Sequence, residues 1–157
     1  MAEALAKLEG KLYIIGLGGS LANAIHMAAD LRKLCDIDAE AFDNIAELTA
    51  RMNDEGPETI FVDWLRRSTD RDALMVLSVG GGAFDVSASI GNAVSSFKGN
   101  VYGIVGPRGG YTAEMGDIVI RIPAPEGAIT PHTEAFQAVI WHCLVSHPLL
   151  QKRPTKW

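Results

Sequence analysis

Residues 11–34, KLYIIGLGGSLANAIHMAADLRKL, decide the fold class that this 157-residue sequence predicts. The segment 11–16 is short and apolar and ends in glycine, which is typical of a buried strand. From Leu21 onward apolar residues recur at helical spacing, so we expect a helix over 21–34 with one buried stripe. The members of this stripe are Leu21, Ala24, Ile25 and Ala28. A strand, a glycine turn and a helix in this order form the repeating unit of a parallel sheet.

The same unit recurs along the chain. Further strands are expected at 39–42, 73–79, 101–106 and 117–123. Further helices are expected from Pro57 to about Ser68, from about Phe84 to Phe97, near Thr112–Met115, and from about His132 to Ser146. This alternation predicts a doubly wound α/β fold, with a mainly five-stranded parallel sheet and helices on both faces. We expect one domain over 1–157, with a short N-terminal helix over 2–9 and a core over 11–150.

The amino-acid composition argues against several classes of protein, among them disordered, nucleic-acid-binding and membrane proteins. Hydrophobic residues make up 48% of the chain and charged residues 21%, which is enough apolar material for a core. The formal net charge is −5 and no basic stripe is visible, so we expect no nucleic-acid partner. There is neither a membrane-length apolar run nor a secretory signal pattern. Cys35 and Cys143 lack paired spacing. We therefore expect a soluble cytoplasmic protein that does not bind membranes.

Three glycine-rich loops follow predicted strands: GLGGS (16–20), VGGG (79–82) and GPRGG (106–110). The carboxyl ends of parallel strands lie at one edge of the sheet, so the loops are expected on one rim. Glycines and helix N-termini favour bound anions there, although any one such loop is as readily a tight turn. The dinucleotide fingerprint fails because Leu21 stands where its third glycine belongs. Ser20 is the expected N-cap, where its hydroxyl caps the helix or holds a phosphate oxygen.

GLGGSLANAIHMAADLRK (16–33) resembles the GGS-to-helix segment of phosphoheptose isomerases, which belong to the sugar isomerase (SIS) family. Four further segments resemble the same family: LTARMNDEG (48–56), LSVGGGAFDV (77–86), GIVGPRGGYTAEMGDIVIRIP (103–123) and TPHTEAFQAVIWHCLVSHP (130–148). The match runs from about residue 11 to 150. The first and last of these segments are specific, whereas glycine turns alone are not.

The resemblance implies an enzyme that isomerises a phosphorylated sugar. The expected reaction converts sedoheptulose 7-phosphate into D-glycero-D-manno-heptose 7-phosphate through an enediol, an early step toward the heptose of bacterial lipopolysaccharide. The resemblance also implies a homo-oligomer, a dimer or tetramer, with the site at the subunit interface. A non-catalytic SIS domain that binds a sugar phosphate or a protein partner is the alternative, because Ser78 alone remains of the family's serine- and threonine-rich phosphate loop.

His26 and Asp30 lie four residues apart and therefore share a helix face, which a solvated polar surface also explains. The resemblance implies that a divalent metal, expected to be zinc, is bound by His26, Asp30, Glu134 and His142. Asp30 and Glu134 stand where the family has glutamate and glutamine. A shift of one residue would instead align Thr133 and Trp141 with the last two ligands. We prefer the first register because it leaves an apolar stripe to be buried, made of Phe136, Val139, Ile140, Cys143 and Leu144.

The roles implied by the resemblance complete the expected site. Asp30 is the base and His142 its acid partner in the proton transfer. The phosphate is held by Gly18, Gly19, Ser20, Ser78, Gly80, Gly81 and Gly82. The sugar hydroxyls are held by Asn53 and Asp54, and Glu134 is expected to contact the substrate as well as the metal.

Overall fold

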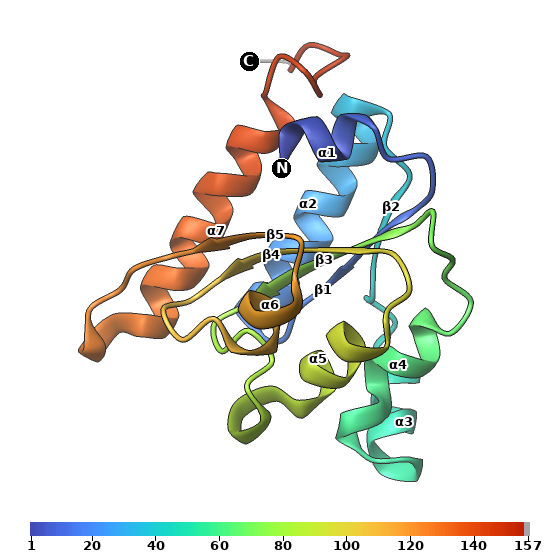
Figure 1. Cartoon of the computed structure of the whole chain (residues 1–157), viewed down its shortest axis with the longest axis vertical. Coiled ribbons are helices and arrows are strands. Elements are labelled where there is room, and N and C mark those ends of the chain that lie inside the picture. The colour runs from blue at the N-terminus through green and yellow to red at the C-terminus, as the bar shows by residue number, and fades with distance from the viewer. Residues whose placement is uncertain (156–157) are drawn as a thin grey trace.

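The computed structural model describes residues 1–155, and at its centre five parallel strands form one sheet in the order β2-β1-β3-β4-β5 (Figure 1). The strands are β1 (Leu12–Ile15), β2 (Ala39–Ala41), β3 (Ala73–Ser78), β4 (Asn100–Val105) and β5 (Ile118–Arg121). All four strand pairs are parallel. The predicted doubly wound α/β fold is therefore confirmed.

Helices cover both faces of the sheet (Figure 1). The α-helices are α1 (Ala2–Ala6), α2 (Gly19–Cys35), α3 (Ile45–Asp54), α4 (Ile60–Leu65), α5 (Phe84–Ser96), α6 (Gly110–Met115) and α7 (Ile129–Val145). Two 3-10 turns, η1 (Pro57–Thr59) and η2 (Glu126–Ala128), precede α4 and α7. No helix among residues 1–155 is long and apolar enough to span a membrane.

Two apolar clusters lie on opposite sides of the sheet. Successive strand residues point to opposite faces, so Met75 and Leu77 of β3 pack with α1, α2 and α7. Leu74 and Val76 of the same strand pack with α4 and α5. All six residues of β3 are buried, as expected for a central parallel strand covered on both faces. Packing against the sheet thus fixes the positions of α2, α5 and α7 relative to the C-terminal ends of the strands.

Two helices differ from the prediction. The N-terminal helix ends at Ala6 instead of residue 9. Helix α3 was not expected, and none of its residues is buried. It is stabilised locally, because the Asn44 side chain accepts a hydrogen bond from the Glu47 N–H, and Glu47 and Arg51 form an ion pair of 2.8 Å. Ile45, Leu48 and Met52 recur at helical spacing, but Ile45 and Met52 remain exposed, so this apolar periodicity corresponds to no buried stripe within one copy of the chain.

The buried face of α7 also differs from the prediction. Its buried residues are Thr133, Gln137, Trp141, Leu144 and Val145. Phe136 and Val139, which were expected inside, are 49% and 54% exposed, and Cys143 is exposed too. Gln137 takes a core position because its amide donates to the Ile104 carbonyl oxygen over 3.1 Å. Leu144 is buried as predicted and Ile140 packs against the core, so the prediction was wrong for three of its five residues. In α2, likewise, Ile25 is exposed.

Asp72 ties the starts of β1 and β3 together, and its removal is expected to destabilise the fold. Its carboxylate accepts hydrogen bonds from the Lys11 N–H (2.7 Å), the Thr69 N–H (2.7 Å) and the Thr69 hydroxyl (2.9 Å). Burial by itself would raise the pKa of Asp72, but these hydrogen bonds outweigh it and lower that pKa. We expect Asp72→Ala to lower the free energy of unfolding by about 1–3 kcal/mol at pH 7.

The sign of the pH dependence follows from the lowered pKa. The contribution of Asp72 is fully present above the unfolded-state pKa and is lost as the pH falls through the folded-state pKa. Urea unfolding of wild type and Asp72→Ala between pH 7 and pH 3 should therefore give a stability difference that shrinks toward acid. Equal midpoints at pH 7 would show that these hydrogen bonds do not stabilise the protein.

Candidate active site

Helices α2 and α7 lie side by side on one face of the sheet (Figure 1). The Trp141 side chain of α7 is buried against α2. The indole is fully buried and stacks on His142, with ring centroids 3.5 Å apart. It also contacts His26 edge-on, with ring centroids 4.7 Å apart. The indole N–H donates to Asn23 Oδ1, and Asn23 in turn donates to the Glu134 carbonyl oxygen over 2.9 Å. Trp141 thus positions one imidazole from each helix at a shared surface.

His26, Asp30 and His142 form a cluster next to the Trp141 side chain, which contacts both imidazoles. One nitrogen or oxygen from each of these side chains lies within 4.8 Å of the others. His26 Nε2 and Asp30 Oδ2 are 3.6 Å apart, and the two imidazole centroids are 5.4 Å apart. His142 Nδ1 lies 2.7 Å from the Ala138 carbonyl oxygen, so this nitrogen donates the proton and Nε2 is left as the possible ligand.

This donor set fits a divalent metal ion. Two imidazoles and a carboxylate are ligands that zinc accepts, and a set of three leaves a fourth position for substrate or water. Ligand atoms around a tetrahedral zinc ion lie about 3.3 Å apart, so small side-chain rotations bring the cluster to binding distance. His26 is 59% exposed and Asp30 19% exposed, so solvent reaches the cluster. The structure therefore contains a candidate metal site on α2 and α7.

Glu134 lies apart from this cluster. Its carboxylate occupies the place where a Cβ atom on Gly19 would stand, at the start of α2. The eight residues from Glu134 to His142 correspond to a helix rise of about 12 Å. Of the four predicted ligands, the structure brings His26, Asp30 and His142 together and places Glu134 toward the other end of the α2–α7 contact.

A small pocket of about 130 Å³ lies where β1 and β3 end. It is lined by Leu17, Ser20, Ser78, Val79, Gly80, Val86, Ser87 and Ile90. Neither α2 nor α5 has a side-chain cap at its N-terminus. Unpaired N–H groups and the helix dipole therefore favour an anion there.

The predicted phosphate residues have different positions around this pocket. Gly18, not Ser20, is the N-cap of α2, and the Ser20 hydroxyl donates to Gln137 Oε1 over 3.0 Å. The Ser78 hydroxyl accepts a hydrogen bond from the Gly81 N–H. Only Gly80 of the glycine triplet lines the pocket.

Gly81 and Gly82 do not line the small pocket, and they contact neighbouring backbone segments instead. Both have positive φ, and the Gly81 carbonyl oxygen accepts hydrogen bonds from the Thr112 N–H and hydroxyl. A Cβ at Gly82 would collide with the backbone of Gly91 in α5. These two glycines therefore shape the loop and let it pack against α5 and α6.

Ser87 is a pocket residue that the sequence analysis missed. Its φ and ψ of −155° and 68° interrupt α5, and its side chain is buried. The Ser87 hydroxyl has no hydrogen-bond partner among residues 1–155. The sequence predicts one continuous helix from Phe84, and nothing in its periodicity marks the interruption. A buried unpaired hydroxyl is costly, so a ligand oxygen in this pocket would stabilise it.

The chain is 33% identical over 151 residues to the phosphoheptose isomerase of Rhodospirillum rubrum, covering 92% of this chain and 78% of that protein. The chain belongs to the phosphoheptose isomerase family. Solved phosphoheptose isomerase structures agree: GmhA from Neisseria gonorrhoeae has a TM-score of 0.81 at 27% identity, covering 92% of this chain and 80% of that chain. The Francisella tularensis protein has a TM-score of 0.77 at 25% identity, covering 92% and 79%. No family model matches the sequence. The resemblance stated from the loop and helix motifs is confirmed.

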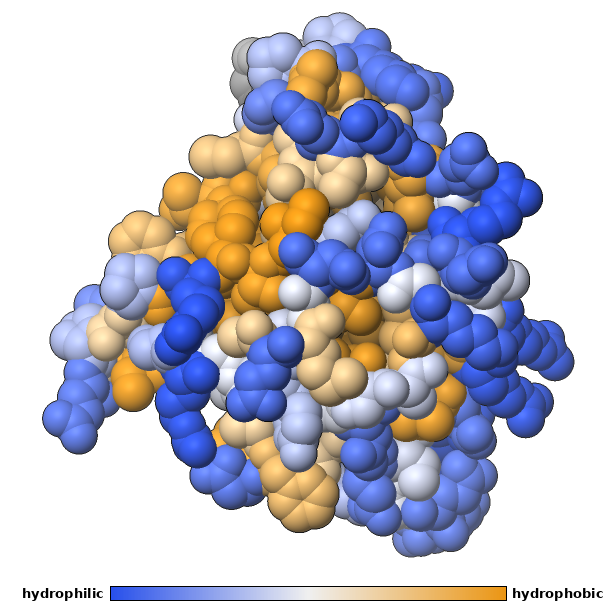
Figure 2. Space-filling view, in the orientation of Figure 1, coloured by the Kyte–Doolittle hydropathy of each residue, from blue (hydrophilic) through white to orange (hydrophobic). Residues whose placement is uncertain are grey.

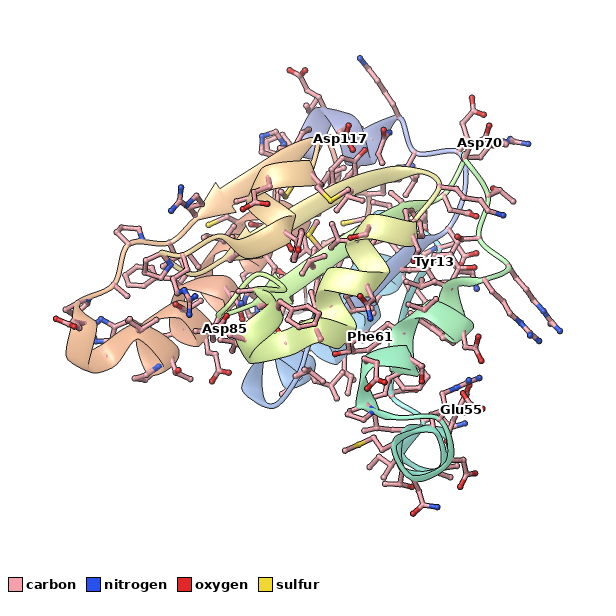
Figure 3. The ribbon with its side chains drawn as sticks, turned by 60° about the horizontal axis from the view of Figure 1, so that its bottom comes forward. Tyr13, Glu55, Phe61, Asp70, Asp85 and Asp117 are labelled. Atoms are coloured by element: carbon pink, nitrogen blue, oxygen red, sulfur yellow. The ribbon has the colours of Figure 1, made fainter. Side chains whose placement is uncertain are left out.

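In this phosphoheptose isomerase family member, Asn53 and Asp54 lie away from the α2–α7 site. They end α3, are exposed, and bond to each other over 2.7 Å. Helix α3 packs against η1 and α4, on the opposite side of the sheet from α2 and α7 (Figure 1). Figure 3 shows the next residue, Glu55, far from Asp85, which lies in the first turn of α5. One copy of the chain therefore does not bring Asn53 and Asp54 to the predicted site.

Proposed function

We propose that the chain is a sugar-phosphate isomerase that converts sedoheptulose 7-phosphate into D-glycero-D-manno-heptose 7-phosphate. The observation that carries this proposal is that the small pocket and the cluster of His26, Asp30 and His142 both lie along α2. Ser20 lines the small pocket at the helix start, and His26 and Asp30 carry the cluster. Six to ten helical residues separate these positions, a rise of about 9–15 Å. An extended seven-carbon sugar phosphate has a comparable length.

The phosphate is assigned to the small pocket. The Ser87 hydroxyl would gain its missing hydrogen bond from a phosphate oxygen, and Ser78 and the Gly80 backbone lie beside it. The N-termini of α2 and α5 add unpaired N–H groups and positive dipole ends. The Ser87 hydroxyl thereby replaces one of the side-chain hydroxyl groups that the glycine triplet cannot provide.

Asp30 is the proposed base. Its carboxylate takes a proton from C1 of the ketose, the C1–H electron pair forms the C1=C2 bond, and the carbonyl pair moves onto O2. Asp30 then returns a proton to C2 while the C1=O1 bond forms, and one proton has passed from O1 to O2. His26, Asp30 and His142 would hold the divalent metal, proposed to be zinc, which when bound withdraws electron density from sugar oxygens.

His142 cannot fill both roles that the resemblance implies. Its Nδ1 faces the Ala138 carbonyl oxygen, which leaves only Nε2 for a metal or for an acidic proton. We assign Nε2 to the metal because the His142 ring belongs to the cluster with His26 and Asp30, and its Nδ1 is already bonded to the Ala138 carbonyl oxygen. Glu134, at Gly19, is assigned to the substrate instead.

We also propose a homo-oligomer, a dimer or tetramer, in which a second copy completes the site. Phe136 and Val139 expose apolar surface on the same helix as His142. Figure 2 shows hydrophobic side chains gathered over α7 and the edge strand β5. Asn53 and Asp54, remote from the site within one copy, would reach it from another. The single domain over 1–157 and the cytoplasmic location stay predictions.

The proposal is tested by incubating the zinc-loaded protein with sedoheptulose 7-phosphate and following the aldose by NMR. We expect the heptose 7-phosphate to appear, the chelated protein to be inactive, and added zinc to restore turnover. Binding of the sugar phosphate without any product would contradict the proposal and favour the non-catalytic alternative.

A further inference from the structure

The metal cluster lines a cavity of about 570 Å³ that extends from the cluster toward the ends of α2 and α7. It is lined by His26, Asp30, Lys33, Leu34, His142, Val145, Ser146 and Thr155. The chain after α7 closes one side, because the Lys152 and Arg153 N–H groups both donate to the Leu34 carbonyl oxygen at the end of α2.

Lys33 brings a positive charge into this cavity. It follows Asp30 by three residues and His26 by seven, so all three share one face of α2. Side chains of a helix tilt toward its N-terminus, which inclines Lys33 toward Asp30. Within residues 1–155, no carboxylate lies at ion-pair distance from Lys33, and Asp30 pairs with His26 instead.

The proposed reaction needs a positively charged group close to the sugar oxygen O2. Proton removal from C1 leaves a negative charge on O2, and donors placed where charge develops are a major source of catalysis. His142 is not available for this role once its Nε2 is assigned to the metal. Among the described residues that line the cavity, Lys33 is the only lysine or arginine.

We propose that the Lys33 ammonium contacts O2 of the enediolate and stabilises its charge, a role that rests on the proposed isomerase function. With the phosphate near Ser20, the reacting carbons lie beside Asp30, and Lys33 is about 4.5 Å further along the helix axis. The 13 residues from Ser20 to Lys33 correspond to about 20 Å, so Lys33 does not share the phosphate of a sugar bound in this way.

The test compares Lys33→Met, Lys33→Arg and the control Lys98→Met, whose lysine is exposed beyond α5. Each protein is assayed for kcat, KM, zinc content and inhibition by inorganic phosphate. We expect Lys33→Met to lower kcat about 10²-fold or more with little change in KM, zinc content or phosphate inhibition. Lys33→Arg should recover much of the loss, and Lys98→Met should behave as wild type. Ser87→Ala should weaken phosphate inhibition instead.

The other outcomes would each overturn the proposal, and their kinetic and metal-binding results differ. If wild type and Lys33→Met were equally active, Lys33 would have no catalytic role, and the proposed isomerase function would still hold. Weaker phosphate inhibition with unchanged kcat would make Lys33 a phosphate ligand, and loss of zinc would make it a structural support of the cluster. A zinc-loaded wild type without isomerase activity overturns the proposed function, and the role of Lys33 with it.

Discussion

Asp30→Asn is expected to lower kcat by roughly 10³-fold, because an amide of the same size cannot take the proton from C1. The Asp30 carboxylate is partly shielded from solvent and lies 3.6 Å from His26 Nε2, so its two oxygens can serve different partners. Oδ2 faces the cluster, and the other oxygen is left for the substrate. The measurement is steady-state kinetics on zinc-loaded protein, together with exchange of the C1 hydrogen for solvent deuterium.

The matched control is Asp43→Asn, which removes an exposed carboxylate in the segment that follows β2. It should retain wild-type kcat and deuterium exchange. Zinc content separates loss of the base from loss of the metal, because Asp30 serves both in the proposed site. An Asp30→Asn protein that keeps its zinc and more than about a tenth of wild-type kcat would exclude Asp30 as the base.

Trp141→Ala is expected to have the largest effect on stability, a loss of about 3–5 kcal/mol in the free energy of unfolding. The indole is fully buried between α2 and α7, so its removal leaves a large cavity. It also supports both imidazoles, by stacking on His142 and by its edge contact with His26. Zinc affinity should therefore fall as well. Urea unfolding of the metal-free protein and zinc titration of the folded protein measure the two effects separately.

Two further variants show whether the effect is specific to the site. Trp141→Phe keeps an aromatic ring against His142 but loses the hydrogen bond to Asn23, so we expect a smaller loss of both stability and zinc affinity. Trp64→Ala removes an indole from the opposite face of the sheet, where it packs against Tyr13 and Phe42. It should lower stability and leave zinc affinity unchanged. If Trp64→Ala weakened zinc binding as much as Trp141→Ala, general loosening would explain both.

Local patterns in the sequence were sufficient for the sheet and for placing together two of the three residues of the candidate metal cluster. The apolar runs of the strands alternate with helices, and this alternation leads directly to a parallel sheet. His26 and Asp30 are four residues apart, so any helix over this segment places them on one face. The partner residue His142 required the family resemblance, because nothing local relates α7 to α2.

The pocket proposed to hold the phosphate was predicted only in part. Strand ends and glycine loops indicated the correct edge of the sheet, and Ser20, Ser78 and Gly80 do line a pocket there. Ser87 was missed because an interruption within a short helix has no periodic signal. Gly81 and Gly82 were assigned to phosphate because a glycine that packs against another loop cannot be distinguished, by sequence, from one that approaches a ligand.

The sequence by itself determined the five strands, the parallel sheet and the pairing of His26 with Asp30, because apolar runs that alternate with helical periodicity and a four-residue spacing are both visible locally. Only the tertiary structure decided which face of α7 is buried. Gln137 and Trp141 lie inside and Phe136 outside because Ile104, Ser20 and Asn23 supply hydrogen-bond partners from distant segments. The cost of burying a polar group depends on such partners, and residue spacing carries no record of them.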